Sequence, residues 1–189
     1  MKIAAFESLE YPGDLAGEVT LDNRRTLRVR PLRRNEEEPV RELFAALSPR
    51  TRYRRFLSPM PTLPDAITRL LTRVDYRRRL ALIAEHDGTA GREVVAMASF
   101  GAVDEGTAEV SLVVRDDWQH QGVGIALGTR VLQAAEARGY HRFIVHFLSD
   151  NVAVRRFLRH VGEVVMVRVT GGFSEVVFVR QPPPTTTAA

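Results

Sequence analysis

The stretch Gln119-His120-Gln121-Gly122-Val123-Gly124 lies between an apolar run, Val110 to Val114, and a long amphipathic segment, Ile125 to Arg138. This pattern predicts a β-strand, a glycine loop and the start of a helix. The two glycines leave room for a phosphate beside the main chain, and the first turn of the helix offers unpaired N–H groups at the positive end of its dipole. The arrangement is typical of a pyrophosphate-binding site.

The segments around this loop alternate between strand and helix patterns. Three strand-like segments in a row precede the loop and predict an antiparallel meander. Gly139 and Gly162 are expected to end the last two helices. The order of elements predicts a mixed α/β fold. Expected strands cover 18–21, 26–30, 80–85, 94–103, 108–114, 143–148, 164–169 and 175–179, and expected helices cover 36–47, a short piece at 53–57, 65–72, 122–138 and 151–161.

Length and composition fit one globular domain. The chain has 189 residues, and we expect an N-terminal extension over 1–17, the domain over 18–180 and a disordered tail over 181–189. The sequence contains no apolar run that would span a bilayer and no signal-peptide core, so we expect a cytoplasmic protein without a membrane partner. The absence of cysteine excludes disulfides, thiolate metal sites and a cysteine nucleophile. We predict no metal.

The sequence does not match two other types of nucleotide-binding loop. A Walker loop requires a lysine after its last glycine, and Lys2 is the only lysine of the chain. A Rossmann loop follows an early parallel strand, whereas this loop follows the last strand of a meander.

Positive charge is modest despite the many arginines. The net charge of +4 is too small for a dedicated nucleic-acid binder, so we expect no nucleic-acid partner. We interpret the cluster of Arg50, Arg52, Arg54 and Arg55 as a solvated helix face near the substrate cleft.

Two sets of residues resemble the GNAT acetyltransferase superfamily. Its acetyl-coenzyme A signature is similar to Val114, 119–124 and Ala126-Leu127, and its second cofactor segment is similar to Asn151, Ala153 and Phe157-Leu158 through Gly162. Further similarity at 28–32, 47–56 and 74–76 narrows the resemblance to bacterial protein-lysine acetyltransferases, with the catalytic domain alone. The resemblance implies the GNAT fold: a mixed, mostly antiparallel central sheet, helices on both faces, and a splayed pair of strands that receives the cofactor.

The resemblance also implies a reaction and its residues. Acetyl-CoA (coenzyme A) is the expected acyl donor, and an amine attacks its thioester directly. Glu109 is the expected catalytic base, a carboxylate whose partial burial would help it to accept the amine proton. The expected acceptor is a lysine side chain of a protein, and the chain is expected to act as a monomer or homodimer. The expected cofactor-binding residues are Leu112, Val113, Val114, Gln119, His120, Gln121, Gly122, Val123, Gly124, Ile125 and Asn151.

Several residues keep a second interpretation. Glu109 also fits an exposed acid at a strand end that faces Arg115 or a neighbour, and Asn151 also fits a helix cap. Leu112 and Val114 also fit plain strand core, and His120 also fits an ordinary solvated loop residue. We interpret Trp118 as a packing anchor.

One departure from the superfamily concerns the leaving thiolate. Many relatives carry a tyrosine as general acid where this chain has Phe157. We therefore expect solvent or the amine's own proton to protonate the thiolate, with Tyr76 and Tyr140 as candidate substitutes. Two other functions stay open: a small-molecule amine acetyltransferase, and a non-catalytic acyl-CoA-binding sensor.

Overall fold

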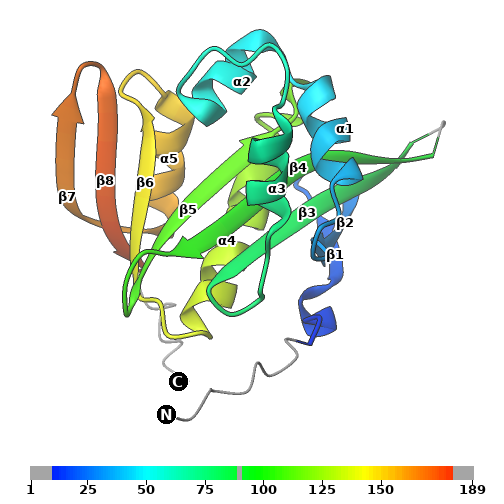
Figure 1. Cartoon of the computed structure of the whole chain (residues 1–189), viewed down its shortest axis with the longest axis horizontal. Coiled ribbons are helices and arrows are strands. Elements are labelled where there is room, and N and C mark those ends of the chain that lie inside the picture. The colour runs from blue at the N-terminus through cyan, green and yellow to red at the C-terminus, as the bar shows by residue number, and fades with distance from the viewer. Residues whose placement is uncertain (1–9, 89–90, 181–189) are drawn as a thin grey trace.

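The computed structural model describes residues 10–88 and 91–180. Its element order agrees with the expected one and confirms the mixed α/β fold (Figure 1). The strands are β1 (Gly17–Thr20), β2 (Thr26–Pro31), β3 (Arg79–Gly88), β4 (Gly91–Ala102), β5 (Thr107–Val114), β6 (Arg142–Leu148), β7 (Gly162–Thr170) and β8 (Phe173–Arg180). The helices are α1 (Glu38–Ala46), α2 (Pro49–Phe56), α3 (Asp65–Thr72), α4 (Val123–Glu136) and α5 (Val152–Val161).

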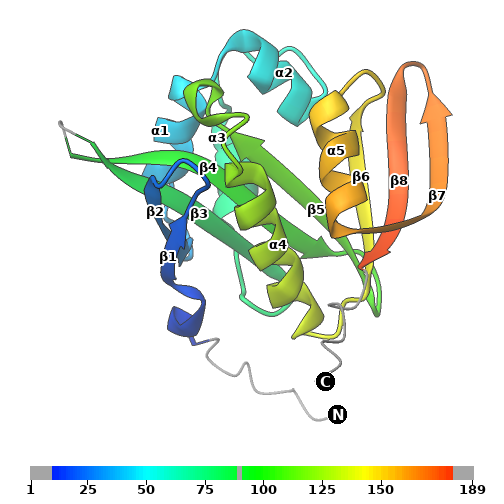
Figure 2. The ribbon, with the colours of Figure 1, turned by 180° about the vertical axis from the view of Figure 1, so that it is seen from behind.

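The strands form one eight-stranded sheet in the order β1-β2-β3-β4-β5-β6-β8-β7. Among the described strands, β5 and β6 form the parallel pair, and the other neighbouring pairs are antiparallel. Helices α1, α2 and α3 lie on one face of the sheet, and α4 and α5 lie on the other (Figures 1 and 2). The expected sheet, with helices on both faces, is therefore confirmed.

Alternation along the strands builds a separate apolar core on each face. On the α4 and α5 side, Phe143 and Phe147 of β6 pack with Leu127 of α4. On the α1 to α3 side, Val113 of β5 packs with Leu43 of α1 and other apolar residues. Neighbouring residues of β5 and β6 therefore point into different environments, which fixes the face on which each polar side chain lies.

The two glycines expected to end helices act differently. Gly139 has φ +90°, and the N–H of Tyr140 bonds to Ala135 O while that of Gly139 bonds to Glu136 O. These two bonds form a Schellman ending of α4, as expected. Gly162 instead is extended at φ −176° and begins β7. A side chain at Gly162 would collide with the backbone of Val179 on β8, so close strand approach rather than helix termination requires this glycine.

The ends of the chain are described in part. Tyr11, in the expected N-terminal extension, donates its hydroxyl to Pro31 O at 3.1 Å and stacks edge-on against Tyr76, so this segment is attached to the domain. The expected tail over 181–189 lies outside the described residues. Within the described ranges, no helix is both long enough and apolar enough to cross a membrane.

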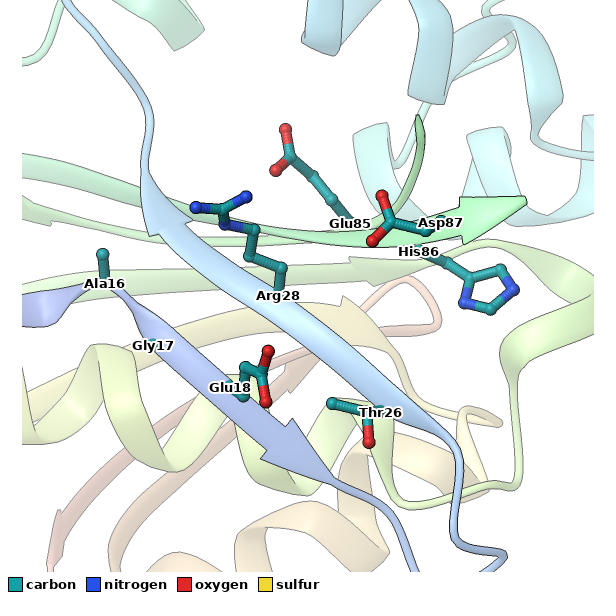
Figure 3. Close-up of a pocket in the computed structure, with 8 residues that line it drawn as sticks. All are labelled: Ala16, Gly17, Glu18, Thr26, Arg28, Glu85, His86 and Asp87. Atoms are coloured by element: carbon teal, nitrogen blue, oxygen red, sulfur yellow. The ribbon is translucent and has the colours of Figure 1, made fainter. Parts of the chain in front are cut away.

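A polar cavity of about 610 Å³ lies at the β1 to β3 edge of the sheet (Figure 3). Its lining is Ala16, Gly17, Glu18, Thr26, Arg28, Glu85, His86 and Asp87, a set that includes none of the expected site residues. The largely buried Glu85 accepts a hydrogen bond from Arg30 Nε at 3.0 Å, while its Oε2 atom has no partner in the structure.

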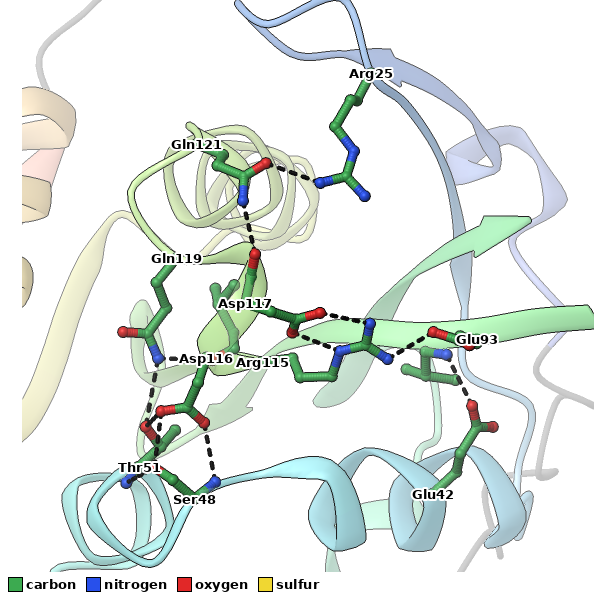
Figure 4. A network of polar contacts seen from close by, with 12 residues as sticks. Arg25, Glu42, Ser48, Thr51, Glu93, Arg115, Asp116, Asp117, Gln119 and Gln121 are labelled. Carbon is green, nitrogen blue, oxygen red and sulfur yellow. Dashed lines mark hydrogen bonds and ion pairs between the residues drawn. The ribbon is translucent and has the colours of Figure 1, made fainter. Parts of the chain in front are cut away.

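Asp116 joins the α1–α2 junction to the segment that follows β5 (Figure 4). Its carboxylate accepts hydrogen bonds from Ser48 N at 2.9 Å, Ser48 Oγ at 2.7 Å and Thr51 Oγ1 at 2.7 Å. Ser48 Oγ also caps α2 by accepting from Thr51 N. Burial alone would raise the pKa of Asp116, but these hydrogen bonds outweigh burial and lower the pKa below its usual value.

An Asp116→Asn variant should unfold with a free energy lower by on the order of 1 kcal/mol at pH 7, because a charged acceptor is lost. The lowered pKa gives a stability contribution that is complete above the unfolded-state pKa of about 3.9 and is lost as pH falls through the folded-state value. Urea unfolding from pH 7 to pH 3 should therefore show the gap between wild type and variant shrinking below about pH 4.

Asp104→Asn, in the β4–β5 turn, serves as the matched control and should leave stability unchanged. A gap between wild type and Asp116→Asn that is constant with pH would contradict this account of the carboxylate.

Candidate active site

The loop between β5 and α4 is anchored by Trp118. This side chain is 1% exposed, with the Arg25 guanidinium 3.5 Å above its ring and the His86 ring 4.8 Å away. Trp118 is therefore the packing anchor expected from the sequence. It fixes the position at which the chain turns from the sheet into α4.

The two glutamines of the loop bond to the protein itself (Figure 4). Gln119 donates its amide to Val114 O at 3.0 Å and to Thr51 Oγ1 at 3.3 Å. Gln121 donates to Asp117 O at 2.7 Å and accepts from Arg25 at 3.1 Å. These side chains shape the loop, so any contact of Gln119 with a ligand through its side-chain amide would have to replace an existing bond.

The start of α4 presents main-chain N–H groups. Gly122 adopts φ +86° immediately before the helix, and no side chain within 10–88 or 91–180 caps the first turn. Val123 is buried, whereas His120, at φ +61°, is exposed. A Cβ atom at Gly124 would lie 3.4 Å from Leu112 Cδ2, an ordinary contact distance, so this turn packs against β5. The amides from Gly122 to Ile125 form an electropositive end that suits an anion.

A gap opens between β5 and β6 beyond Glu109. The two strands pair only over Thr107–Glu109 and Arg142–Ile144, while β5 continues along β4 and β6 continues along β8. Figure 1 shows the two strands diverging above this point. Residues Leu112, Val113 and Val114 thus lie on a stretch of β5 whose β6-side edge has lost its strand partner.

Backbone alternation identifies the groups that line this gap. Arg115 N donates to Val95 O of β4, so the alternate residues Val113 and Ser111 also direct their N–H and C=O groups toward β4. Leu112 and Val114 direct theirs toward the gap, where Gln119 already bonds to Val114 O. The side chains of Leu112 and Val114 pack against the core on the α4 side, and that of Val113 is buried on the other face. The core interpretation of Leu112 and Val114 therefore applies, and the binding of their backbone groups to a cofactor stays a prediction.

Glu109 is the last residue of β5 that pairs with β6, and it lies on the α2 side of the sheet. Its side chain is 55% exposed, and Oε1 lies 3.5 Å from His146 Nδ1. The partial burial expected for Glu109 is thus wrong for this structure, because the gap above it opens the carboxylate to solvent. It faces His146 rather than Arg115, whose guanidinium pairs with Glu93 and Asp117.

The prediction that the arginines of α2 form a solvated face is wrong for two of them, Arg55 and Arg52. Arg55 points toward β5 and donates to Ser111 Oγ at 2.9 Å, and Ser111 in turn bonds to Ser99 at 2.8 Å. Burial lowers the pKa of Arg55 and the nearby charge of Glu109 opposes this shift. Arg52 donates to the carbonyls of Phe44, Ala45 and Pro61, so it caps the end of α1.

Asn151 lies at the N-terminus of α5, next to the end of β6. Its side-chain oxygen accepts from Val154 N at 3.4 Å and the residue is 8% exposed, so the capping interpretation applies. Phe157 of the same helix lies against Gly128 of α4, where any side chain would collide with its ring.

The two tyrosines considered as candidate general acids make other contacts in the structure. Tyr140 is buried against Phe100, and the Tyr76 hydroxyl accepts from Arg34 N.

Two residues beside Glu109 were missed in the sequence. His146 alternates with the core residues Val145 and Phe147, a pattern that places it on the α2 side, but only the β5–β6 register brings it to Glu109. Arg55 was read as part of a charged helix face. A helical projection would have placed Arg55 on the same side of α2 as Thr51, but it would not have shown which strand that side contacts.

Comparison with known proteins identifies the family of the chain. The model of the acetyltransferase (GNAT) family matches residues 40–162. Acetyltransferase PA5475 of Pseudomonas aeruginosa is 29% identical over 137 residues, which are 72% of this chain and 74% of the relative. Acetyltransferase Pat of Mycolicibacterium smegmatis is 36% identical over 122 residues, which are 62% of this chain but only 35% of that protein.

A solved structure shares the architecture. The GNAT domain of PAT from S. lividans superposes with a TM-score of 0.79 at 26% identity, covering 90% of this chain and 99% of that one. The family match includes the β5–α4 loop, Glu109 and Asn151, and it spans more than half of the chain. The chain therefore belongs to the acetyltransferase (GNAT) family and is an acetyltransferase.

Proposed function

We propose that this enzyme transfers the acetyl group of acetyl-CoA to lysine side chains of proteins. One observation carries the proposal: β5 and β6 separate directly after Glu109, so a carboxylate and unpaired main-chain groups share one gap. The uncapped start of α4 lies at the far end of the same strand. A long donor with an anionic end and an amide-bearing arm fits this order of groups.

The chain's own groups suit the parts of coenzyme A. The amides from Gly122 to Ile125 would hold the pyrophosphate. Leu112 and Val114 would bond to the amide-bearing arm as a strand would, since their edge of β5 faces the gap. Asn151 lies across the gap, where its side chain would contact the arm, and Gln119 and His120 border the phosphate position. Bound in this way, acetyl-CoA supplies an activated acetyl thioester.

Glu109 is the group best suited to remove the amine proton. A lysine ammonium has a reference pKa near 10.4 and must lose a proton before its nitrogen can attack. Glu109 lies on the face of the sheet opposite α4 and is open to solvent, so an incoming side chain can reach it. Phe157 has no proton to give, and solvent or the amine's own proton remains the source for the leaving thiolate.

Two features favour a protein lysine over a small amine. The carboxylate is open at the surface rather than enclosed, which suits a long side chain projecting from a large partner. The resemblance of 28–32, 47–56 and 74–76 to bacterial protein-lysine acetyltransferases points the same way, and this chain matches about a third of Pat's length. The cytoplasmic location, the oligomeric state and a metal-free reaction stay predictions.

Incubation of the enzyme with acetyl-CoA and a lysine-containing cell extract should produce new acetyl-lysine sites, detected by mass spectrometry. Because Lys2 is the only lysine of this chain, self-acetylation is confined to one side chain and is easily separated from transfer to other proteins. A panel of free amines serves as the comparison. Rapid turnover of a free amine with no new protein sites would replace the lysine proposal by the small-molecule alternative.

Glu109→Gln should lower kcat by about 10²-fold to 10⁴-fold, the range typical of a lost general base. The dissociation constant of acetyl-CoA, measured by calorimetry, should stay within about twofold, because the phosphate-binding amides are untouched. Glu105→Gln, an acid in the β4–β5 turn, is the matched control and should retain full activity. Unchanged turnover by Glu109→Gln would remove Glu109 from the mechanism. Binding of acetyl-CoA without transfer by the wild type would favour a sensor.

A further inference from the structure

A row of charged side chains crosses four neighbouring strands beside the proposed base. Glu109 on β5 is followed by His146 on β6, Glu175 on β8 and Arg168 on β7. His146 Nδ1 lies 3.5 Å from Glu109, His146 Nε2 lies 3.2 Å from Glu175, and Glu175 lies 3.5 Å from Arg168. The imidazole therefore has one ring nitrogen directed at each carboxylate.

Strand register fixes this row. Glu109 is paired with Ile144, so His146, two residues further along β6, lies on the same face of the sheet. His146 is directly opposite Glu175, and Glu175 is directly opposite Arg168. The backbone register thus keeps these four residues on neighbouring strands and on the same face of the sheet. A change of side-chain rotamer would not alter this alignment.

The proposed reaction requires an exit for a proton. Overall, R–NH₃⁺ and the thioester give the amide, the thiol of coenzyme A and one H⁺: a C–N bond forms, a C–S bond breaks, and the nitrogen loses two protons. One of these protons ends on the thiolate. The other, taken by Glu109, must leave before the carboxylate can accept the next.

We propose that His146 relays this proton, taking it from Glu109 at Nδ1 and releasing the proton of Nε2 through Glu175 to water. The inference rests on the proposed role of Glu109. Histidine suits the step because imidazole accepts and releases protons near neutral pH through two distinct nitrogens. Glu175 is 30% exposed, so the relay ends at solvent. An acceptor bound over Glu109 would cover the carboxylate's own solvent-facing side and leave this lateral exit open.

The charges around the relay stabilise a protonated imidazole. Arg55 of α2 donates to Ser111, two residues after Glu109 on β5, and Arg54 pairs with Asp150 at 3.9 Å. Arg168 lies behind Glu175 at the far end of the row. His146 thus faces one carboxylate on each side, Glu109 and Glu175. A positive charge that forms on the imidazole is stabilised on both sides.

Replacement of His146 tests the relay by steady-state kinetics on a blocked peptide with a single lysine, or on the best free amine if that is the faster substrate. His146→Gln should lower kcat by about tenfold or more, with KM for acetyl-CoA unchanged, as expected for a lost proton-transfer group. The pH dependence of kcat should differ between the wild type and the variant, because the relay needs an imidazole that can accept a proton. Glu175→Gln should give a smaller decrease, and His141→Gln, five residues earlier, should match the wild type.

Chemical rescue separates a relay from a structural role. Imidazole added to His146→Ala should restore turnover in proportion to its concentration, while thermal unfolding checks that the variant is folded. A wild-type kcat and pH profile in His146→Gln, or a folded but inactive His146→Ala that imidazole does not restore, would overturn the relay. Glu109→Gln would still be inactive in both cases, so the proposed function would stand. Failure of the wild type to acetylate any amine would instead overturn the proposed function.

Discussion

The site depends on one constraint: β5 and β6 stop bonding to each other after Glu109, while each stays bonded to a different neighbour. Buried or ligand-facing main-chain groups need partners, so an unpaired strand edge inside a sheet is costly unless something occupies it. Here the edge of Leu112 and Val114 borders the gap, and Gln119 donates a hydrogen bond to the main-chain carbonyl of Val114. We propose that the remaining groups bind the amide-bearing arm of the acyl donor.

The two faces of the sheet carry different parts of the proposed site. On one face, α4 begins against β5 at Gly124 and presents its uncapped amides, while α5 covers the end of β6. On the other face, Asp116 ties the start of α2 to the segment after β5, and α2 in turn places Arg55 beside Glu109. Donor and acceptor would therefore reach the gap from opposite sides. Asp116 and Gln119 both bond to Thr51, which joins the loop to α2.

The residue patterns of single segments predict most of the helices and strands. The features that these patterns do not predict depend on contacts between segments. Periodicity gave the strands and helices, and the glycine loop with its flanking run identified the start of α4. The burial of Glu109 was wrong because exposure at a strand end depends on whether the next strand continues, and the register of a parallel pair leaves no signal in either strand. For the same reason His146 and the inward direction of Arg55 were missed. Gly162 was assigned to helix termination, whereas the approach of Val179 from a distant strand requires it.

The central claim is that the gap-facing backbone of β5 binds the donor. Amide hydrogen exchange, measured residue by residue by NMR with and without coenzyme A, tests it directly. The account predicts that Leu112 and Val114 gain protection together with the first turn of α4, while Ser111 and Val113, already directed toward β4, do not change. Equal protection of all four β5 amides, or of none, would contradict it.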